Sequence, residues 1–244
     1  MRVALLGATK GMGRALARRM AERGDRVFLL GRDTHELDRS AADLAARGGS
    51  VAGVAPCDLA QPEQFVSALA AAEAALGGLD TVVVTAGAFA TQERLEEDRG
   101  LARALLDIDF ARTLEFCEVA RERLLAGGGG TLCVFSSVAG ERGRKPVILY
   151  GAAKAGLTRY LEGLDHKFRR LGLEVVCVKP GFVKTGMTAE LEPPPFAGEP
   201  DAAARRVLAA IDRGRPVVYV PGIWRWVMLL VRHLPRWVMR RVGF

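Results

Sequence analysis

A tyrosine and a lysine stand four positions apart, at Tyr150 and Lys154, in a segment of helical composition. This spacing places both side chains on one face of a helix, one turn apart. An unperturbed tyrosine titrates near pH ~10, so alone it is a poor acid or base at neutral pH. A neighbouring ammonium stabilises the phenolate and lowers that pKa, so the pair predicts an acid–base catalyst.

A serine upstream completes the candidate catalytic set. Ser137 follows a strand-like run at 131–135 and lies thirteen residues before Tyr150. Its hydroxyl can donate a hydrogen bond to a carbonyl oxygen on which negative charge develops. The spacing of tyrosine and lysine is common by chance, but together with the serine it predicts proton transfer to or from an oxygen of the substrate.

A glycine-rich turn near the N-terminus predicts the binding of a dinucleotide. The run Gly7-Ala-Thr-Lys-Gly-Met-Gly13 follows the first strand-like run and opens a helical segment. Glycines permit positive φ and let backbone N–H groups approach a pyrophosphate at the positive end of a helix. The cofactor contacts expected here are Gly7, Thr9, Lys10, Gly11, Met12 and Gly13.

The end of the second strand-like run indicates which cofactor binds. NAD-binding proteins place an acid there to hold the ribose 2′-hydroxyl. Gly31 occupies that position and Arg32 follows it, while Lys10 adds a second positive charge. Because a guanidinium and an ammonium suit a 2′-phosphate, the sequence predicts NADP(H). Asp58 and Leu59 follow the third strand-like run, where we expect the adenine.

Strand-like runs alternate with longer segments of helical period along the chain. This alternation predicts an α/β fold with one Rossmann-like, doubly wound parallel sheet of about seven strands and helices on both faces. The expected strands are 3–6, 27–30, 51–56, 81–85, 131–135, 174–178 and 217–220. The expected helices are 11–23, 35–47, 62–76, 101–125, 150–171 and 201–213. We assign residues 1–221 to the catalytic domain and 222–244 to a helical tail.

The tail differs in composition from the rest of the chain. It holds all three tryptophans and five arginines but no acid. Seven of the 35 basic residues lie after Asp212, so the remainder of the chain has 28 basic residues and 28 acidic ones. A nucleic-acid-binding protein would carry a basic stripe across its fold, so we expect no nucleic-acid partner.

Read as helix, the tail is amphipathic, and Pro235 is expected to split it into two helices. Its longest apolar run, 226–231, is far shorter than the roughly 18–20 residues that span a bilayer. Two interpretations remain open. The tail is either an interfacial anchor, with tryptophan and arginine at the lipid headgroups, or an extension that packs on its own subunit or across a dimer.

The cysteines indicate the compartment. Cys57, Cys117, Cys133 and Cys177 are widely spaced and form no C-x-x-C pair, which is typical of buried free thiols in a reducing cytosol. A strand-like run begins at Val3, so we expect no signal peptide. We expect no metal site and a cytoplasmic protein, either free or peripheral at the inner face of the membrane.

The motifs together resemble the classical short-chain dehydrogenase/reductase family over nearly the whole chain. The resemblance implies that Tyr150 gives a proton to the substrate oxygen and that Ser137 positions the substrate. It implies that Lys154 holds the nicotinamide ribose and tunes the tyrosine, while the nicotinamide delivers hydride to a carbonyl carbon. Assembly into a homodimer or homotetramer is implied as well.

Two further segments match family motifs. Thr85-Ala-Gly87 is similar to the family's N-A-G stretch, with threonine in place of asparagine, so the resemblance implies cofactor contacts at Ala86 and Gly87. The run 179–185 resembles the family's P-G segment. It implies contacts from Pro180 and Gly181 and carboxamide binding by Val183 and Thr185.

Asp109 stands where the family has its catalytic asparagine. That asparagine supports a water that bridges to the lysine, largely through its backbone carbonyl. Aspartate either keeps this backbone role and pairs electrostatically with Lys154, or it marks a slow or specialised enzyme. We expect an active one, because the tyrosine, lysine and serine are all present.

The half of the chain after Phe135 also resembles bacterial reductases of decaprenylphosphoryl 2-keto-pentose, in 139–144, 150–156, the P-G segment and 226–236. This implies a ketone on a lipid carrier, with a 3-ketosphinganine-like ketone as a related possibility. Three other readings stay open. They are a soluble reductase or alcohol dehydrogenase of small carbonyl compounds, a catalytically weak NADP-binding regulator, and an NAD-dependent dehydrogenase, against which Lys10 and Arg32 argue.

Overall fold

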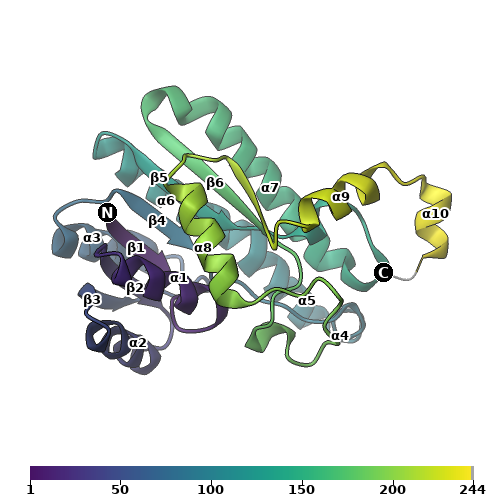
Figure 1. The fold of residues 1–244 in the computed structure, drawn as a ribbon, viewed down its shortest axis with the longest axis horizontal. Coiled ribbons are helices and arrows are strands. Elements are labelled where there is room, and N and C mark those ends of the chain that lie inside the picture. The colour runs from purple at the N-terminus through teal and green to yellow at the C-terminus, as the bar shows by residue number, and fades with distance from the viewer. Residues whose placement is uncertain (243–244) are drawn as a thin grey trace.

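The computed structural model describes residues 1–242, and within them seven strands form one parallel sheet (Figure 1). The strand order is β3-β2-β1-β4-β5-β6-β7, so the direction of winding reverses between β1 and β4. The strands are β1 (Arg2–Leu6), β2 (Arg26–Gly31), β3 (Ser50–Pro56), β4 (Thr81–Val84), β5 (Gly130–Phe135), β6 (Leu173–Pro180) and β7 (Val217–Val220). Doubly wound sheets bind ligands at such a reversal, beyond the carboxyl ends of the strands. The predicted fold is confirmed.

Helices cover both faces of the sheet (Figure 1). One layer consists of α1 (Gly11–Glu22), α2 (Thr34–Ala46) and α8 (Pro200–Ile211), in which α1 packs against α8. The other consists of α3 (Gln64–Leu76), α6 (Thr113–Ala126) and α7 (Ile148–Phe168). The layers therefore bury the strands on both sides, as the uninterrupted apolar runs of parallel strands require.

Successive residues of the central strands alternate between the two cores. In β1, Leu5 packs toward α1 and α8, whereas Leu6 packs toward α3 and α6. In β4, Val83 and Val84 divide in the same way. All four cysteines are free and buried, as predicted, and burial raises the pKa of Cys57 to about 12.

One expected helix is interrupted. The segment predicted as a single helix over 101–125 consists of α5 (Arg99–Leu106), a wider π-helical turn η1 (Asp107–Arg112) and α6. The hydroxyl of Thr113 donates to the carbonyl of Ile108 at 2.7 Å and supports this turn. Turns of this kind recur at functional sites, and η1 carries Asp109 with its side chain fully buried. A short helix, α4 (Gln92–Glu97), had no counterpart in the sequence prediction.

The C-terminal tail forms two helices, α9 (Trp224–His233) and α10 (Arg236–Arg241), which extend from one end of the molecule (Figure 1). Pro235 separates them, as predicted. Met228 and Val231 of α9 are buried against Val138, so one face of the tail packs on its own chain. Within the described residues, every helix is too short or too polar to cross a membrane.

Candidate active site

Ser137, Tyr150 and Lys154 converge at the carboxyl end of β5. Ser137 lies two residues past the end of the strand, and its Oγ accepts a hydrogen bond from the Ala139 N–H at 3.1 Å. Tyr150 and Lys154 lie on the first turns of α7, and the Lys154 ammonium is 5.6 Å from the centre of the tyrosine ring. The edge of the Tyr150 ring meets Phe89, with 5.2 Å between ring centres. The structure thus brings together the serine, tyrosine and lysine that the sequence singled out.

Asp109 forms a buried ion pair with Lys154. Its Oδ1 lies 3.2 Å from the lysine Nζ and also accepts a hydrogen bond from the Ala88 N–H at 2.9 Å. A Cβ at Gly87 would lie 2.7 Å from this same oxygen, so only glycine fits beside the pair. The carboxylate itself therefore contacts the catalytic lysine.

Burial and neighbouring charges both shift the pKa values of Asp109, Lys154 and Tyr150. Burial raises the pKa of Asp109, and the Lys154 ammonium limits that rise. Burial opposes the charge of Lys154, but Asp109 and Tyr150 together raise the pKa of this lysine above its ordinary value. Burial also raises the pKa of Tyr150; Lys154 and the neighbouring Ser137 hydroxyl oppose this rise, while Asp109 adds to it. The net shift of the tyrosine pKa is upward, so the lowered pKa that the sequence predicted is wrong: the ammonium limits the rise and does not reverse it.

The glycine turn forms a cradle next to β4. Gly7 and Gly11 have positive φ, at 96° and 52°, and a Cβ at Gly13 would overlap the carbonyl oxygen of Gly7. The Thr85 hydroxyl donates to the carbonyls of Leu6 at 3.0 Å and Gly7 at 2.9 Å. Threonine in place of the family's asparagine thus still ties β4 to the turn. These backbone positions fit a bound dinucleotide, for which α1 supplies its positive end.

The edge of the cradle at β2 is positively charged. Lys10 and Arg32 are exposed, and neither forms an ion pair within residues 1–242. The side chain of Asp33 accepts the N–H of Glu36 at 3.1 Å and caps α2. Gly31, at the end of β2, has no carboxylate to hold a ribose 2′-hydroxyl, whereas two cations face solvent.

Other residues predicted to contact the cofactor follow the ends of β3 and β6. Asp58 caps the turn after β3 by accepting the Ala60 N–H at 3.0 Å, and Leu59 is buried beside it. After β6, Val183 pairs with Gly198 in an isolated bridge. Thr185 reaches across to the glycine turn, since a Cβ on Gly11 would lie 3.2 Å from its methyl carbon.

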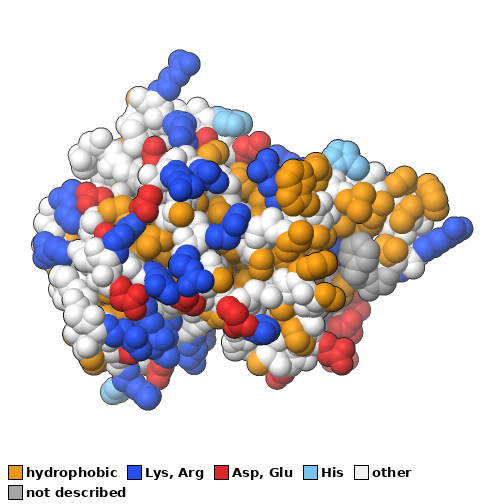
Figure 2. Space-filling view, in the orientation of Figure 1, with side chains coloured by type: hydrophobic (Ala, Val, Ile, Leu, Met, Phe, Trp, Pro, Cys, Tyr) orange, Lys and Arg blue, Asp and Glu red, His pale blue; other side chains and the backbone are white. Residues whose placement is uncertain are grey.

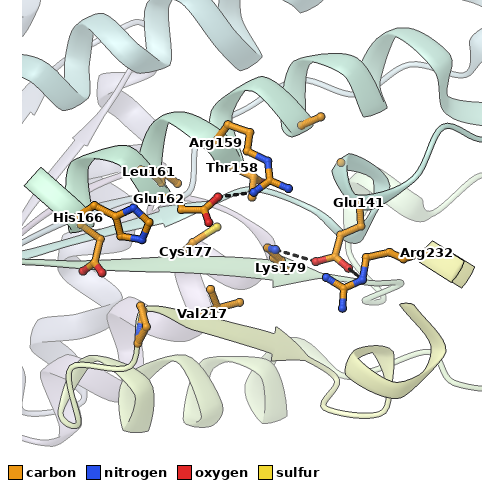
Figure 3. A pocket seen from close by; sticks show the side chains of 14 residues that line it. Glu141, Thr158, Arg159, Leu161, Glu162, His166, Cys177, Lys179, Val217 and Arg232 are labelled. Atoms are coloured by element: carbon orange, nitrogen blue, oxygen red, sulfur yellow. Dashed lines mark hydrogen bonds and ion pairs between the residues drawn. The ribbon is translucent and has the colours of Figure 1, made fainter. Parts of the chain in front are cut away.

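A second hollow lies further along α7 from the catalytic residues (Figure 3). This cavity of about 330 Å³ is lined by Thr158 and Glu162 of α7, by Lys179 of β6 and by Glu141. Tyr150, Ser137 and Lys154 do not line it. Sequence reasoning did not single out Glu141 as a site residue, although the stretch 139–144 that contains it was part of the closer resemblance.

The comparisons decide the family. Residues 2–195 match the sequence model described as short chain dehydrogenase. The chain belongs to this family. It is 32% identical to an uncharacterized oxidoreductase of Mycobacterium tuberculosis strain H37Rv over 243 residues, 98% of this chain and 96% of that one. An uncharacterized oxidoreductase of Streptomyces coelicolor is 36% identical over 255 residues, covering 98% and 94%.

Solved structures of the family share the fold. A short-chain type dehydrogenase/reductase from Mycobacterium ulcerans aligns with a TM-score of 0.81 at 21% identity, over 89% of this chain and 87% of that one. A variant of actinorhodin polyketide ketoreductase solved with NADPH aligns at 0.80 and 23% identity, over 89% and 95%. This short-chain dehydrogenase is therefore an oxidoreductase acting between CH–OH and C=O, with a nicotinamide dinucleotide as cofactor. The resemblance to reductases of decaprenylphosphoryl keto-pentose stays a prediction.

Proposed function

We propose that this short-chain dehydrogenase is an NADPH-dependent ketone reductase acting on a lipid-linked or long-chain substrate at a membrane surface. The observation that carries the cofactor assignment is the pair of solvent-facing cations, Lys10 and Arg32, beside a strand end whose acid, Asp33, is used as a helix cap. The ketoreductase solved with NADPH supports the same direction of reaction.

Each residue of the site has its own role in the proposed reduction. NADPH, when bound along the glycine turn, supplies the hydride for the carbonyl carbon. The Ser137 hydroxyl donates a hydrogen bond to the carbonyl oxygen, where negative charge develops. The Tyr150 hydroxyl gives its proton to that oxygen, and the adjacent Lys154 ammonium stabilises the phenolate that is left. Asp109 keeps the lysine charged and in place through the 3.2 Å pair.

The NADPH assignment predicts that removing the two cations weakens the binding of NADPH but not that of NADH. Replacing Lys10 and Arg32 together with glutamine should raise KM for NADPH by about 10²–10⁴-fold, because two charge-assisted bonds to a phosphate are lost and each contributes roughly 1.5–3 kcal/mol. KM for NADH should stay within twofold, which steady-state kinetics with both cofactors would show. Arg39→Gln is the matched control, since Arg39 pairs with Glu36 on the exposed side of α2. An equal loss with both cofactors would contradict the assignment.

The outer face of the tail supports the membrane proposal. Trp226, Leu230 and Trp237 are 62%, 67% and 61% exposed. Apolar side chains gather over this end of the molecule (Figure 2). Arg225 lies over the ring of Trp226 and Arg241 over that of Trp237, at 5.6 and 5.7 Å. Aromatic rings beside arginines, with no acid in the tail, fit the headgroup region of an anionic bilayer.

Co-sedimentation with phosphatidylglycerol-containing vesicles tests this face. The full chain should bind, and binding should weaken from 50 to 500 mM salt, because arginines near a charged surface contribute about 1 kcal/mol each. The variant Trp226→Ser, Leu230→Ser, Trp237→Ser should stay in the supernatant, whereas Leu171→Ser, an equally exposed leucine outside the tail, should bind normally. If neither the wild type nor the triple variant sediments, the soluble reductase of small carbonyls becomes the better assignment. If both sediment, the outer face of the tail is not the membrane-binding surface.

We extend the proposal to a peripheral location at the inner face of the membrane. Assembly into a homodimer or homotetramer also remains a prediction, in keeping with a family whose members are commonly oligomeric. The division into a catalytic domain, 1–221, and a tail, 222–244, is likewise a proposal; the packing of α9 on Val138 means that the tail is not a detached segment.

A further inference from the structure

Glu141 is a buried carboxylate that the reaction described above does not use. It ends the short helical turn η2 (Val138–Glu141), which begins directly after Ser137. Its side chain is only 3% exposed, and Oε1 accepts hydrogen bonds from Lys179 Nζ at 2.7 Å and from the Tyr219 hydroxyl at 2.6 Å. Its other oxygen faces Nε of Arg232 at 3.7 Å (Figure 3).

The partners of Glu141 come from three different elements. Lys179 is in β6 immediately before Pro180, Tyr219 is in β7, and Arg232 is on the last turn of α9. The Ser137 hydroxyl in turn reaches the carbonyl of Pro180 at 3.4 Å. One carboxylate therefore connects the serine turn, the P-G segment and the C-terminal tail.

Helix α9 contacts the same two segments through its apolar side. Met228 and Val231 pack on Val138, the residue after Ser137. The indole of Trp224 lies so close to Gly181 that a Cβ at that glycine would overlap the ring. The tail thus touches the serine turn and the P-G segment at points next to the residues that meet substrate and cofactor.

Two basic residues between Ser137 and Tyr150 donate hydrogen bonds to carbonyls at the C-terminal ends of the tail helices. Arg142 donates to the carbonyl of Leu234 at 2.8 Å, just past α9, and Lys145 donates to the carbonyl of Arg240 at 2.8 Å in α10. Carbonyls at a helix C-terminus lack partners within the helix, so basic side chains are suited to them. The segment that leads from Ser137 to Tyr150 is therefore fastened to α9 and α10 along its length.

We propose that Glu141 is a positioning residue for the reaction, and that it makes α9 part of the active-site wall by fixing Ser137 and Pro180–Gly181 relative to each other. This inference rests on the proposed catalytic role of Ser137 but not on membrane binding. Displacing a catalytic group by a fraction of an ångström lowers the rate strongly, because the reacting atoms must be held near attack geometry. We call Glu141 and its contacts with Lys179, Tyr219 and Arg232 the latch. Because it acts on the geometry of the site, it should affect turnover in solution, without any lipid.

The test uses the full-length chain, a water-soluble ketone that the wild type reduces with NADPH, and no lipid. Glu141→Gln and, separately, Arg232→Met should each lower kcat by about tenfold, while KM for NADPH stays within twofold. Arg213→Met is the matched control, because Arg213 is an exposed arginine outside the tail, and its kcat should be unchanged. Wild-type kcat in both latch variants would overturn the proposal.

Hydrogen exchange provides a readout that does not depend on turnover. In Arg232→Met, which removes a partly exposed side chain and should fold normally, amide exchange across 137–141 and 180–183 should accelerate about tenfold, whereas exchange in α3 should be unchanged. Unchanged exchange at both segments would contradict the latch. If instead the wild type reduces no ketone but the exchange pattern changes as described, the latch stands and the proposed function fails.

Discussion

Replacing Tyr150 with phenylalanine should lower kcat for ketone reduction by about 10²–10⁴-fold, because the substrate oxygen then loses its proton donor. The substitution removes one hydroxyl and leaves the ring, so the edge contact with Phe89 at 5.2 Å is kept. NADPH should bind as before, since the glycine turn and the cations at β2 are untouched. Stopped-flow measurement of NADPH oxidation, together with a fluorescence titration of NADPH, gives both quantities.

Tyr160→Phe is the matched control for this experiment. Tyr160 lies on the same helix, and its hydroxyl donates to Glu118 of α6 at 2.6 Å. Its loss should leave kcat within about twofold. A Tyr150→Phe enzyme with more than a tenth of wild-type kcat would show that another group donates the proton.

The second prediction concerns Asp109. Asparagine at this position can still accept the Ala88 N–H and the Lys154 ammonium through Oδ1, so Asp109→Asn should fold. It removes, however, the negative charge that raises the pKa of Tyr150 and of Lys154. Both groups then lose their protons at lower pH, and the alkaline limb of the kcat/KM profile for reduction should move to lower pH.

Few groups act on the pKa values of Tyr150 and Lys154 and so on this limb. Lys154 and Ser137 face the tyrosine together with Asp109, and Cys177 is the further group that acts on the lysine. A profile from pH 6 to 11 for wild type and Asp109→Asn would show the shift. An alkaline limb at the same or a higher pH in the variant would contradict the role assigned to the carboxylate. A large gain in turnover at neutral pH would instead favour the weakly catalytic regulator.

Alanine at position 109 should lower the free energy of unfolding. Asp109→Ala leaves the Lys154 ammonium buried without its partner, which costs about 3–5 kcal/mol. Because the folded-state pKa of Lys154 is raised, its pairing stabilises the fold below the unfolded pKa near ~10.4 and is lost as pH rises through the folded value. Urea unfolding at pH 8 lies inside this window. A loss of less than about 1 kcal/mol would show that the pair contributes little.

Much of the fold and of the site followed from local signals. The alternation of strand-like and helical segments requires no knowledge of distant contacts, and it led to the parallel sheet. The spacing of Tyr150 and Lys154 fixes their shared helix face, and the end of β5 fixes Ser137. The glycine turn and Arg32 could be placed for the same reason, because each lies at the end of its own strand.

Other features depend on contacts between distant segments and left no local signal. The wide turn that buries Asp109 is indistinguishable from ordinary helix in sequence, although the pairing with Lys154 was one of the two expected outcomes. The sequence gives no sign that Glu141 is buried, because its burial comes from the packing of β6, β7 and α9 around it. Of the two interpretations of the tail, packing on its own chain is seen at Met228 and Val231. Trp226 and Leu230 face outward, and membrane binding through them stays a proposal.

The most direct test of the central claim is transfer of label from the cofactor. The wild-type protein is incubated with NADPH carrying two deuterium atoms at C4 of the nicotinamide and with ketones presented both in solution and in vesicles, and the products are analysed by mass spectrometry. The account predicts a carbinol with one deuterium at the former carbonyl carbon and more product from a vesicle-borne ketone than from its short-chain analogue. With Tyr150→Phe, labelled product should form at least about 100-fold more slowly. Intact NADPH binding with no labelled carbinol from any ketone would contradict it.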